Sequence, residues 1–171
     1  NHRLFIPLMP AAASWMNLKE EYDLIFSSSA GFGKGISYHP KTLHIAYCHT
    51  PLRYAWESDR YFNWNSFWKL VSAPVFWYLR KWDLLAAQKP EILIANSLYI
   101  AGKIKDYYKR DAEVIYPPVD LKVFYRDKKV KKGGYFLAVG RMLPYKRFDL
   151  VIQAFNRLNL PLLVAGDGPE L

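Results

Sequence analysis

The sequence contains few of the residues that build disulfides and metal centres. Among its 171 residues are one cysteine, Cys48, and four histidines. One thiol cannot form an intramolecular disulfide or a cluster of thiolate ligands, and the histidines lack a paired ligand spacing. Long apolar runs are also missing, since the longest, from Leu70 to Leu79, has ten residues, where about 20 are needed to cross a bilayer. We therefore expect no metal site and no transmembrane span.

The two ends of the sequence lack other signals. The first residues contain no positively charged region followed by an apolar core, so no export signal is evident and we expect a cytoplasmic protein. At the other end, the turn from Gly166 to Pro169 follows an apolar run and would ordinarily lead into another element. We interpret the sequence as a piece of a longer protein.

The overall composition is that of a folded, basic protein. Hydrophobic residues make up 51% of the chain and charged residues 23%, which excludes disorder of the whole chain. Lys and Arg number 24 against 15 Asp and Glu, for a formal net charge of +9. This excess predicts attraction to phosphates or anionic surfaces without choosing among them.

Part of this charge is concentrated between Lys122 and Lys132. Six residues of this stretch are basic and one, Asp127, is acidic, and apolar periodicity is absent after Tyr125. A solvated linker is the simplest interpretation.

Aromatic residues, 17% of the chain, crowd between Tyr61 and Trp82. Basic residues, Lys69 and Arg80 among them, are interspersed. Such a mixture suits a lipid headgroup layer, where aromatic rings lie at the interface and basic side chains contact anionic phosphates. The alternative, an aromatic-rich helical core or a flap over a cleft, is favoured because Pro74 interrupts the segment and no single apolar face emerges.

Short apolar runs alternate with helical patterns, which predicts an α/β fold with a parallel sheet flanked by helices. Strands are predicted over residues 24–27, 44–47, 92–95, 112–115, 135–139 and 162–165. Apolar residues repeat at helical spacing after the N-cap residue Ser97 and predict a helix over 98–108. The same spacing predicts a second helix over 147–158.

The clearest domain boundary follows the helix at 98–108. Pro117 and Pro118 cannot continue a helix or a central strand, and the basic stretch and the pair Gly133-Gly134 come next. We therefore predict one α/β lobe over 1–116, a linker over 117–132 and the start of a second lobe over 133–171.

The most informative local pattern for function lies after the strand at 135–139. Gly140 and Arg141 follow it, and a short loop with Lys146 precedes the helix at 147–158. In an open α/β sheet the carboxyl ends of the strands face the ligand crevice, where helix N-termini favour anions. Arg offers a planar fork, Lys a point charge, and Gly140 allows close backbone approach, so these residues suit a diphosphate. Basic residues on an ordinary surface are the alternative.

Two weaker candidates follow other strands. The stretch 27–35 contains three alternating glycines, Gly33 among them, and is a candidate phosphate cradle, although it lacks the dinucleotide and P-loop spacings and a flexible loop is the simpler interpretation. His49 follows the strand at 44–47 and could hydrogen-bond a sugar hydroxyl or a phosphate, or be structural. The acids Asp23, Glu57, Asp59 and Asp83 are scattered and form no acid/base couple.

Four stretches together resemble retaining glycosyltransferases of family GT4. They are YCHTPLRYAWE at 47–57, ANS at 95–97, YYKRDAEVIYPPVD at 107–120 and VGRMLPYKRFDLVIQAFNRLNLPLLVAGDGPE at 139–170. The likeness extends from about Tyr22 over most of the chain. The HTPLRYAW portion points to the GDP-mannose-dependent mannosyltransferase branch.

The resemblance implies a GT-B fold, with a partial N-terminal Rossmann-like lobe on the acceptor side and the start of a C-terminal lobe that binds the nucleotide sugar. Arg141 and Lys146 match the family's basic pair on the donor diphosphate, where they stabilise charge on the leaving group. His49 matches a position near the transferred sugar. Members work without a metal or other cofactor, and retention is ascribed to departure and attack on one face of the sugar without a protein nucleophile.

We therefore expect transfer of a hexose, mannose from GDP-mannose, to a saccharide or lipid-linked acceptor at the inner membrane face, as in polysaccharide biosynthesis. The family's glutamate pair is expected beyond Leu171, and its opening strand and glycine-rich loop before Asn1. The isolated chain is accordingly expected to be inactive.

Two other hypotheses remain. A non-catalytic membrane- or polyanion-binding module would use the segments 61–82 and 122–132, and its binding would not depend on Arg141. Nucleic-acid binding rests on charge and aromatic content alone, and no recognised nucleic-acid signature supports it, so we expect no nucleic-acid partner.

Overall fold

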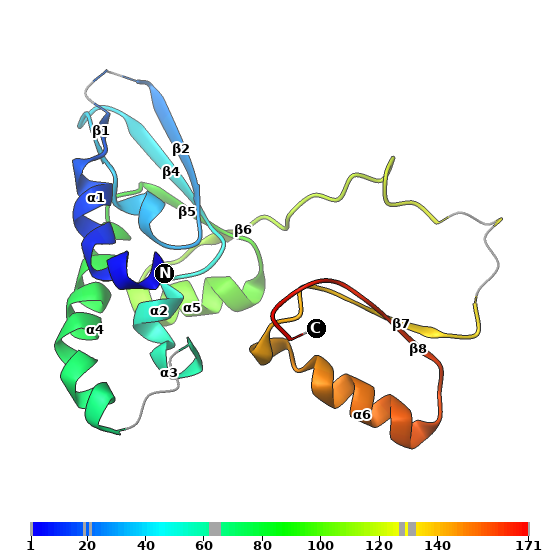
Figure 1. The fold of residues 1–171 in the computed structure, drawn as a ribbon. Coiled ribbons are helices and arrows are strands. Elements are labelled where there is room, and N and C mark those ends of the chain that lie inside the picture. Colours follow the sequence, from blue (N-terminus) through cyan, green and yellow to red (C-terminus); the bar gives the residue numbers. More distant parts are fainter. Residues whose placement is uncertain are drawn as a thin grey trace. The chain divides into compact units, whose positions relative to one another are not determined.

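A computed structural model of the chain describes residues 2–18, 20, 22–61, 66–126, 129 and 133–170. The chain forms two compact units, Asn1–Pro118 and Val119–Leu171, and each is described by itself (Figure 1). The functional division into an acceptor-side lobe, a linker and a nucleotide-sugar lobe stays a prediction, and Asp127, Lys128, Lys131 and Lys132 of the basic stretch lie outside the described residues.

The first unit is built on a parallel sheet with the strand order β2-β4-β5-β6. Its strands are β2 (Leu24–Ser29), β4 (Leu43–Cys48), β5 (Ile92–Ala95) and β6 (Glu113–Val114), and a second parallel pair joins β1 (Asn17–Leu18) to β3 (Ser37–Tyr38). The register pairs Ser29 with Cys48, and Cys48 with Ala95. The carboxyl ends of neighbouring strands therefore meet at one edge of the sheet.

Helices connect these strands. They are the 3-10 helices η1 (His2–Leu8) and η2 (Phe32–Gly35) and the α-helices α1 (Met9–Trp15), α2 (Arg53–Trp56), α3 (Ser58–Tyr61), α4 (Ser66–Ala86) and α5 (Leu98–Tyr108). No helix in the described ranges is long and apolar enough to cross a membrane.

The two faces of the main sheet differ in burial. Ala46, Leu93 and Ala95 on one face pack against buried residues of α5, Ile104 and Tyr108. The alternate residues of β2 and β4 on the other face, Leu24, Phe26 and Leu43, are exposed. The hydrophobic core of this unit therefore lies between one face of the sheet and its helices.

Helix α4 continues through Pro74, so the expectation that Pro74 interrupts this segment is wrong. A proline at this position leaves the carbonyl of Leu70 without its helical N–H partner. Leu70 and Pro74 both lie on the exposed side of the helix, where water can bond this carbonyl. Phe62 and Trp64 of the aromatic segment lie outside the described residues.

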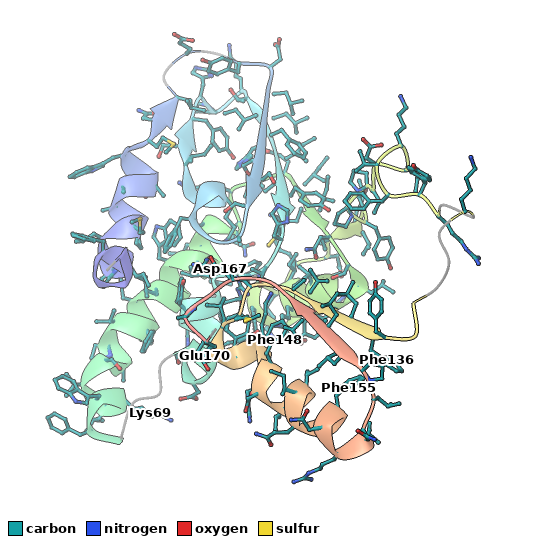
Figure 2. All side chains as sticks on the ribbon, turned by 45° about the vertical axis from the view of Figure 1, so that its right-hand side comes forward. Lys69, Phe136, Phe148, Phe155, Asp167 and Glu170 are labelled. Atoms are coloured by element: carbon teal, nitrogen blue, oxygen red, sulfur yellow. The ribbon has the colours of Figure 1, made fainter. Side chains whose placement is uncertain are left out.

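The second unit comprises β7 (Phe136–Val139), η3 (Pro144–Lys146), α6 (Phe148–Leu158) and β8 (Leu162–Ala165), with β7 and β8 parallel. Figure 2 shows Phe155 of α6 directed toward Phe136 of β7, and their ring centroids are 5.0 Å apart. Among the described residues of this unit, Met142 alone is buried.

The α/β class with parallel sheets is confirmed. Each predicted strand is present, with ends that differ by at most two residues, and the helices predicted at 98–108 and 147–158 are α5 and α6. The short strands β1 and β3 had no counterpart in the sequence analysis, because two-residue strands carry no periodicity. The N-terminal helices η1 and α1 had no counterpart either.

Candidate functional site

In the second unit, the loops that follow β7 and β8 enclose an open hollow of about 510 Å³. Gly140 and Arg141 line it from the first loop, and Gly166, Asp167 and Gly168 from the second. The Gly140 N–H donates to the Ala165 carbonyl at 3.0 Å, and the Met142 N–H donates to the Asp167 carbonyl at 2.8 Å. These bonds hold the two loops together at the carboxyl ends of the strands.

Two glycines make this close approach possible. A Cβ atom on Gly166 would lie 2.0 Å from the Gly140 carbonyl oxygen, and one on Gly168 would lie 2.2 Å from the Met142 carbonyl oxygen. Both distances are far below van der Waals contact. No other residue type fits these two positions without displacing the loop that follows β7.

Arg141 and Lys146, the predicted basic pair, are both exposed on this unit. Lys146 folds back over Gly140, since its Nζ atom lies 3.2 Å from the place that a Cβ on Gly140 would occupy. Neither side chain has a hydrogen-bond or ion-pair partner among the described residues. Two cations without counter-ions therefore lie next to the hollow and to the N-terminal end of α6.

The neighbouring cation, Arg147, differs from Arg141 and Lys146 because it has an acidic partner. Its guanidinium makes a two-pronged contact with Asp149, with Nε 2.9 Å from Oδ1 and Nη2 2.8 Å from Oδ2. This contact lowers the pKa of the Asp149 carboxyl. Arg147 also has a left-handed backbone, with φ of 52°. It shapes the start of α6 and is already neutralised there, which leaves Arg141 and Lys146 as the cations available to an anion.

In the first unit, His49 lies where sequence analysis placed it, exposed at the carboxyl edge of the sheet. Its Nε2 is 2.9 Å from the Ser28 hydroxyl, and its backbone N–H donates to Ser29. The Asn96 side-chain amide donates to the His49 carbonyl at 3.2 Å. The imidazole is therefore held by Ser28 of β2, and the His49 backbone by Ser29 and by Asn96 after β5, in a position to hydrogen-bond a sugar hydroxyl.

The glycine-containing stretch after β2 is ordered by local hydrogen bonds. It forms η2, and the Ser29 hydroxyl accepts the N–H groups of Gly31 and Gly33 at 3.0 Å each. A Cβ on Gly33 would lie 2.8 Å from that of Ser29. The amide of Gly33 is bonded within the chain, so its contact with a donor phosphate stays a prediction that this geometry does not support.

Sequence analysis missed a buried polar network beneath this edge. The carboxylate of Asp83 accepts hydrogen bonds from Lys34 Nζ at 2.5 Å, the Tyr108 hydroxyl at 2.7 Å, Trp56 Nε1 at 2.8 Å and the Leu52 N–H at 3.3 Å. The ion pair is almost fully buried, with Lys34 3% exposed and Asp83 0%. Burial, reinforced by the charge of Asp83, raises the pKa of the Tyr108 hydroxyl.

A sequence signal for this network exists. Asp83 is one of the scattered acids of the sequence analysis, yet on α4 it shares the buried face with Leu79, four residues earlier. Ala87, four residues later and just beyond the end of α4, is also buried. A lone acid at core spacing in an apolar helix is either neutralised by a partner or destabilising. The identity of the partner, Lys34, depends on tertiary structure, since it lies 49 positions away.

Comparison with known proteins bears mainly on the first unit. A family model described as Glycosyltransferase Family 4 matches residues 1–123, which is more than half of the chain. A comparison with curated protein sequences found no match. Arg141 and Lys146 lie outside the matched range.

Proposed function

The chain belongs to Glycosyltransferase Family 4, and on this premise we propose that it transfers a hexose from a nucleotide sugar, whose diphosphate is bound by Arg141 and Lys146. The observation that carries the proposal is the pair of exposed cations beside the glycine-lined hollow. Both lack side-chain partners among the described residues, and a diphosphate supplies the missing negative charge.

The chemistry of transfer suits these groups. When the bond between sugar and diphosphate breaks, negative charge develops on the leaving phosphate oxygen. A guanidinium and an ammonium already in position stabilise that charge without reorganisation, and the N-terminal end of α6 adds a favourable dipole. Glycine at positions 140, 166 and 168 lets the phosphates approach the backbone.

His49 is the candidate for contact with the transferred sugar in the first unit. The stretch 47–57 that contains it carries the likeness to GDP-mannose-dependent enzymes. Within that stretch, Leu52 and Trp56 bond to Asp83 and have a structural role, whereas His49 and Arg53 are exposed. We accordingly propose a two-lobed GT-B enzyme that transfers mannose from GDP-mannose to a saccharide or lipid-linked acceptor with retention, and that requires no metal or other cofactor.

Binding of nucleotide sugars by the purified chain tests the proposal. Titration calorimetry with GDP-mannose, UDP-glucose and ADP-glucose is expected to show binding of GDP-mannose at the lowest concentration, with competition by GDP. Preference for another nucleotide would overturn the donor assignment and leave the transferase proposal intact. Absence of binding by all three donors and by GDP would overturn both.

The second candidate, a non-catalytic module that binds anionic surfaces, is favoured by the exposed aromatic and basic side chains of α4. It predicts that Arg141→Ala leaves the chain's binding properties unchanged. The transferase proposal predicts weaker nucleotide binding by the same variant.

A further inference from the structure

Two neighbouring serines of β2 hydrogen-bond to two different histidines. On the face of the sheet that packs against the helices, the Ser27 hydroxyl lies 2.8 Å from Nε2 of His44, and both residues are buried. On the other face, the Ser28 hydroxyl lies 2.9 Å from Nε2 of His49, and both residues are exposed. Because successive residues of a strand point to opposite faces, the same contact occurs in opposite surroundings.

The surroundings of His49 leave its imidazole little freedom. The ring meets that of Tyr47 edge to face, with centroids 5.1 Å apart and an interplanar angle of 72°. The Tyr47 hydroxyl donates to the Ile115 carbonyl at 2.9 Å, which fixes the tyrosine ring in turn. The His49 backbone is held by Ser29 and by Asn96. Groups at or just beyond the carboxyl ends of β2, β4, β5 and β6 therefore hold one imidazole.

Within this frame the imidazole has two ring orientations, related by a half turn about its Cβ–Cγ bond. In the observed orientation Nε2 meets the Ser28 hydroxyl. After the half turn, the carbon Cε1 would take the place of Nε2 and the hydrogen bond would be lost. A hydrogen bond of this kind favours the observed orientation about fivefold.

The other ring nitrogen of His49, Nδ1, has no hydrogen-bond partner among the described residues. His44 also turns Nε2 toward its serine, but its Nδ1 is buried. The His49 side chain is exposed, so the ring nitrogen that Ser28 does not bind can meet a ligand. A hydroxyl both donates and accepts, and it therefore bonds Nδ1 in either tautomer of the imidazole.

A hydroxyl within reach of Nε2 is also the arrangement of a serine nucleophile and its base. In that arrangement a third group, commonly a carboxylate, orients the base through its other ring nitrogen. In the part of the chain that the structure describes, no such group bonds Nδ1 of His49. The geometry therefore favours a positioning role for Ser28 over nucleophilic attack.

We propose that Ser28 is a positioning residue for sugar binding, because it occupies Nε2 of His49 and leaves Nδ1 as the ring nitrogen that bonds a hexose hydroxyl. This role rests on the transfer reaction proposed above. It adds to that reaction the atom of His49 that the sugar contacts and the residue that orients it. Ser28 acts through the imidazole and does not itself touch the donor.

Nitrogen-15 NMR of the histidine rings tests the contact without any ligand. Ser28→Ala is expected to shift both ring-nitrogen resonances of His49, because the hydrogen bond at one ring nitrogen decides which of the two carries the proton. Ser28→Thr keeps the hydroxyl, suits a strand and is expected to restore the resonances. Resonances of His49 that are the same in Ser28→Ala and in the parent chain would overturn the proposal.

Calorimetric titration with GDP-mannose and with GDP tests the effect on the sugar. Ser28→Ala is expected to weaken GDP-mannose binding about fivefold and to leave GDP binding unchanged, whereas Ser28→Thr should bind both like the parent chain. Ser27→Ala is the matched control, since it removes the same bond from the buried face. It should lower the urea midpoint and, where folded, leave both affinities unchanged. Equal loss of GDP-mannose binding in the two alanine variants, or no loss in Ser28→Ala, overturns the positioning role.

Two substitutions of His49 identify the ring nitrogen that meets the sugar. The polar end of an asparagine side chain lies as many bonds from Cα as Nδ1 of histidine, and that of glutamine as many as Nε2. His49→Asn is therefore expected to bind GDP-mannose within about twofold of the parent chain, and His49→Gln about fivefold more weakly than the parent chain. The reverse order, or equal loss in both variants, overturns the assignment to Nδ1.

The same titrations separate this role from the transfer reaction itself. A parent chain that binds GDP through Arg141, but whose GDP-mannose binding does not respond to Ser28→Ala or to either His49 variant, overturns the positioning role and leaves the transferase proposal intact. A parent chain that binds neither GDP nor GDP-mannose overturns the transferase proposal, and with it the sugar contact at Nδ1.

Discussion

Lys34 in the first unit and Lys146 in the second have similar positions in the sequence and opposite environments. Each follows a parallel strand and a glycine. Lys146 is a predicted phosphate ligand, and Lys34 lies within the stretch 27–35, the weaker candidate for a phosphate cradle. Lys34 is 3% exposed and bonds to Asp83 and to the Gly31 carbonyl. Lys146 is exposed and has no side-chain partner among the described residues. A buried acid within reach of Lys34 makes that lysine structural, whereas the exposed Lys146 has no such acid and stays available for the proposed diphosphate.

The two units differ in burial in the same way as these two lysines. The first encloses a hydrophobic core and a buried polar network, whereas Met142 is the only buried residue described in the second. In the second unit, the close approach of its two loops depends on glycines and on backbone hydrogen bonds. Substitutions should therefore act through buried charge in the first unit and through backbone contact in the second.

The largest expected effect is that of Asp83→Ala. Removing this carboxylate leaves Lys34 as a buried cation without a counter-ion and deprives three further donors of their acceptor. The free energy of unfolding should fall by about 3–5 kcal/mol, measured by urea titration with tryptophan fluorescence. Asp59→Ala, which breaks the exposed pair with Lys69, is the control and should leave the urea midpoint unchanged. Equal midpoints for the two variants would contradict the structural role of the network.

Gly166→Ala tests the role of close backbone contact in the second unit. The added methyl group would collide with the Gly140 carbonyl and separate the loops after β7 and β8. Hydrogen-exchange protection of the Gly140 and Met142 amides should fall by about fivefold or more, because each of these hydrogen bonds contributes about 1 kcal/mol. Gly134→Ala is the control, since a Cβ there meets nothing within 4 Å. Unchanged protection in Gly166→Ala would mean that the two loops are not held in contact.

Cysteine chemistry reports the difference in burial between the units. Burial raises the pKa of the Cys48 thiol to about 11, so it should react with Ellman's reagent only as fast as the first unit opens. Val139→Cys in a Cys48→Ala background places a thiol at a site that is 69% exposed in the second unit. That thiol should react at the rate of a free thiol. Similar rates for the two would contradict the difference in burial.

The raised pKa of Cys48 also has a consequence for stability. The folded chain keeps the thiol protonated, whereas the unfolded chain releases the proton above about pH 8.5. The contribution of Cys48 is therefore fully present below that pH and is lost as the pH rises toward 11. Relative to Cys48→Ala, the parent chain should lose stability over this range, and parallel pH curves would contradict the shift.

Local sequence patterns predicted the strands and two of the helices because apolar runs and helical spacing are imposed by the core that they form. They also placed His49 and Arg141 just after strands, and Lys146 just before the helix at 147–158, where the structure has them, because parallel strands share one carboxyl edge. The continuity of α4 through Pro74 was not predictable from a local rule, since it depends on which side of the helix is exposed. The pairing of Lys34 with Asp83 joins residues distant in sequence and requires the tertiary fold.

The central claim is that Arg141 and Lys146 bind a diphosphate whereas Lys34 supports the fold. Calorimetric titration with GDP, together with urea unfolding of the same samples, tests it on Arg141→Ala with Lys146→Ala, on Lys34→Met and on the exposed control Arg157→Ala. The account predicts that the double variant binds GDP at least about tenfold more weakly and unfolds like the parent chain. It predicts that Lys34→Met unfolds at lower urea and, where folded, binds GDP normally, and that Arg157→Ala changes neither property. A double variant that binds GDP as tightly as the parent chain would contradict the account.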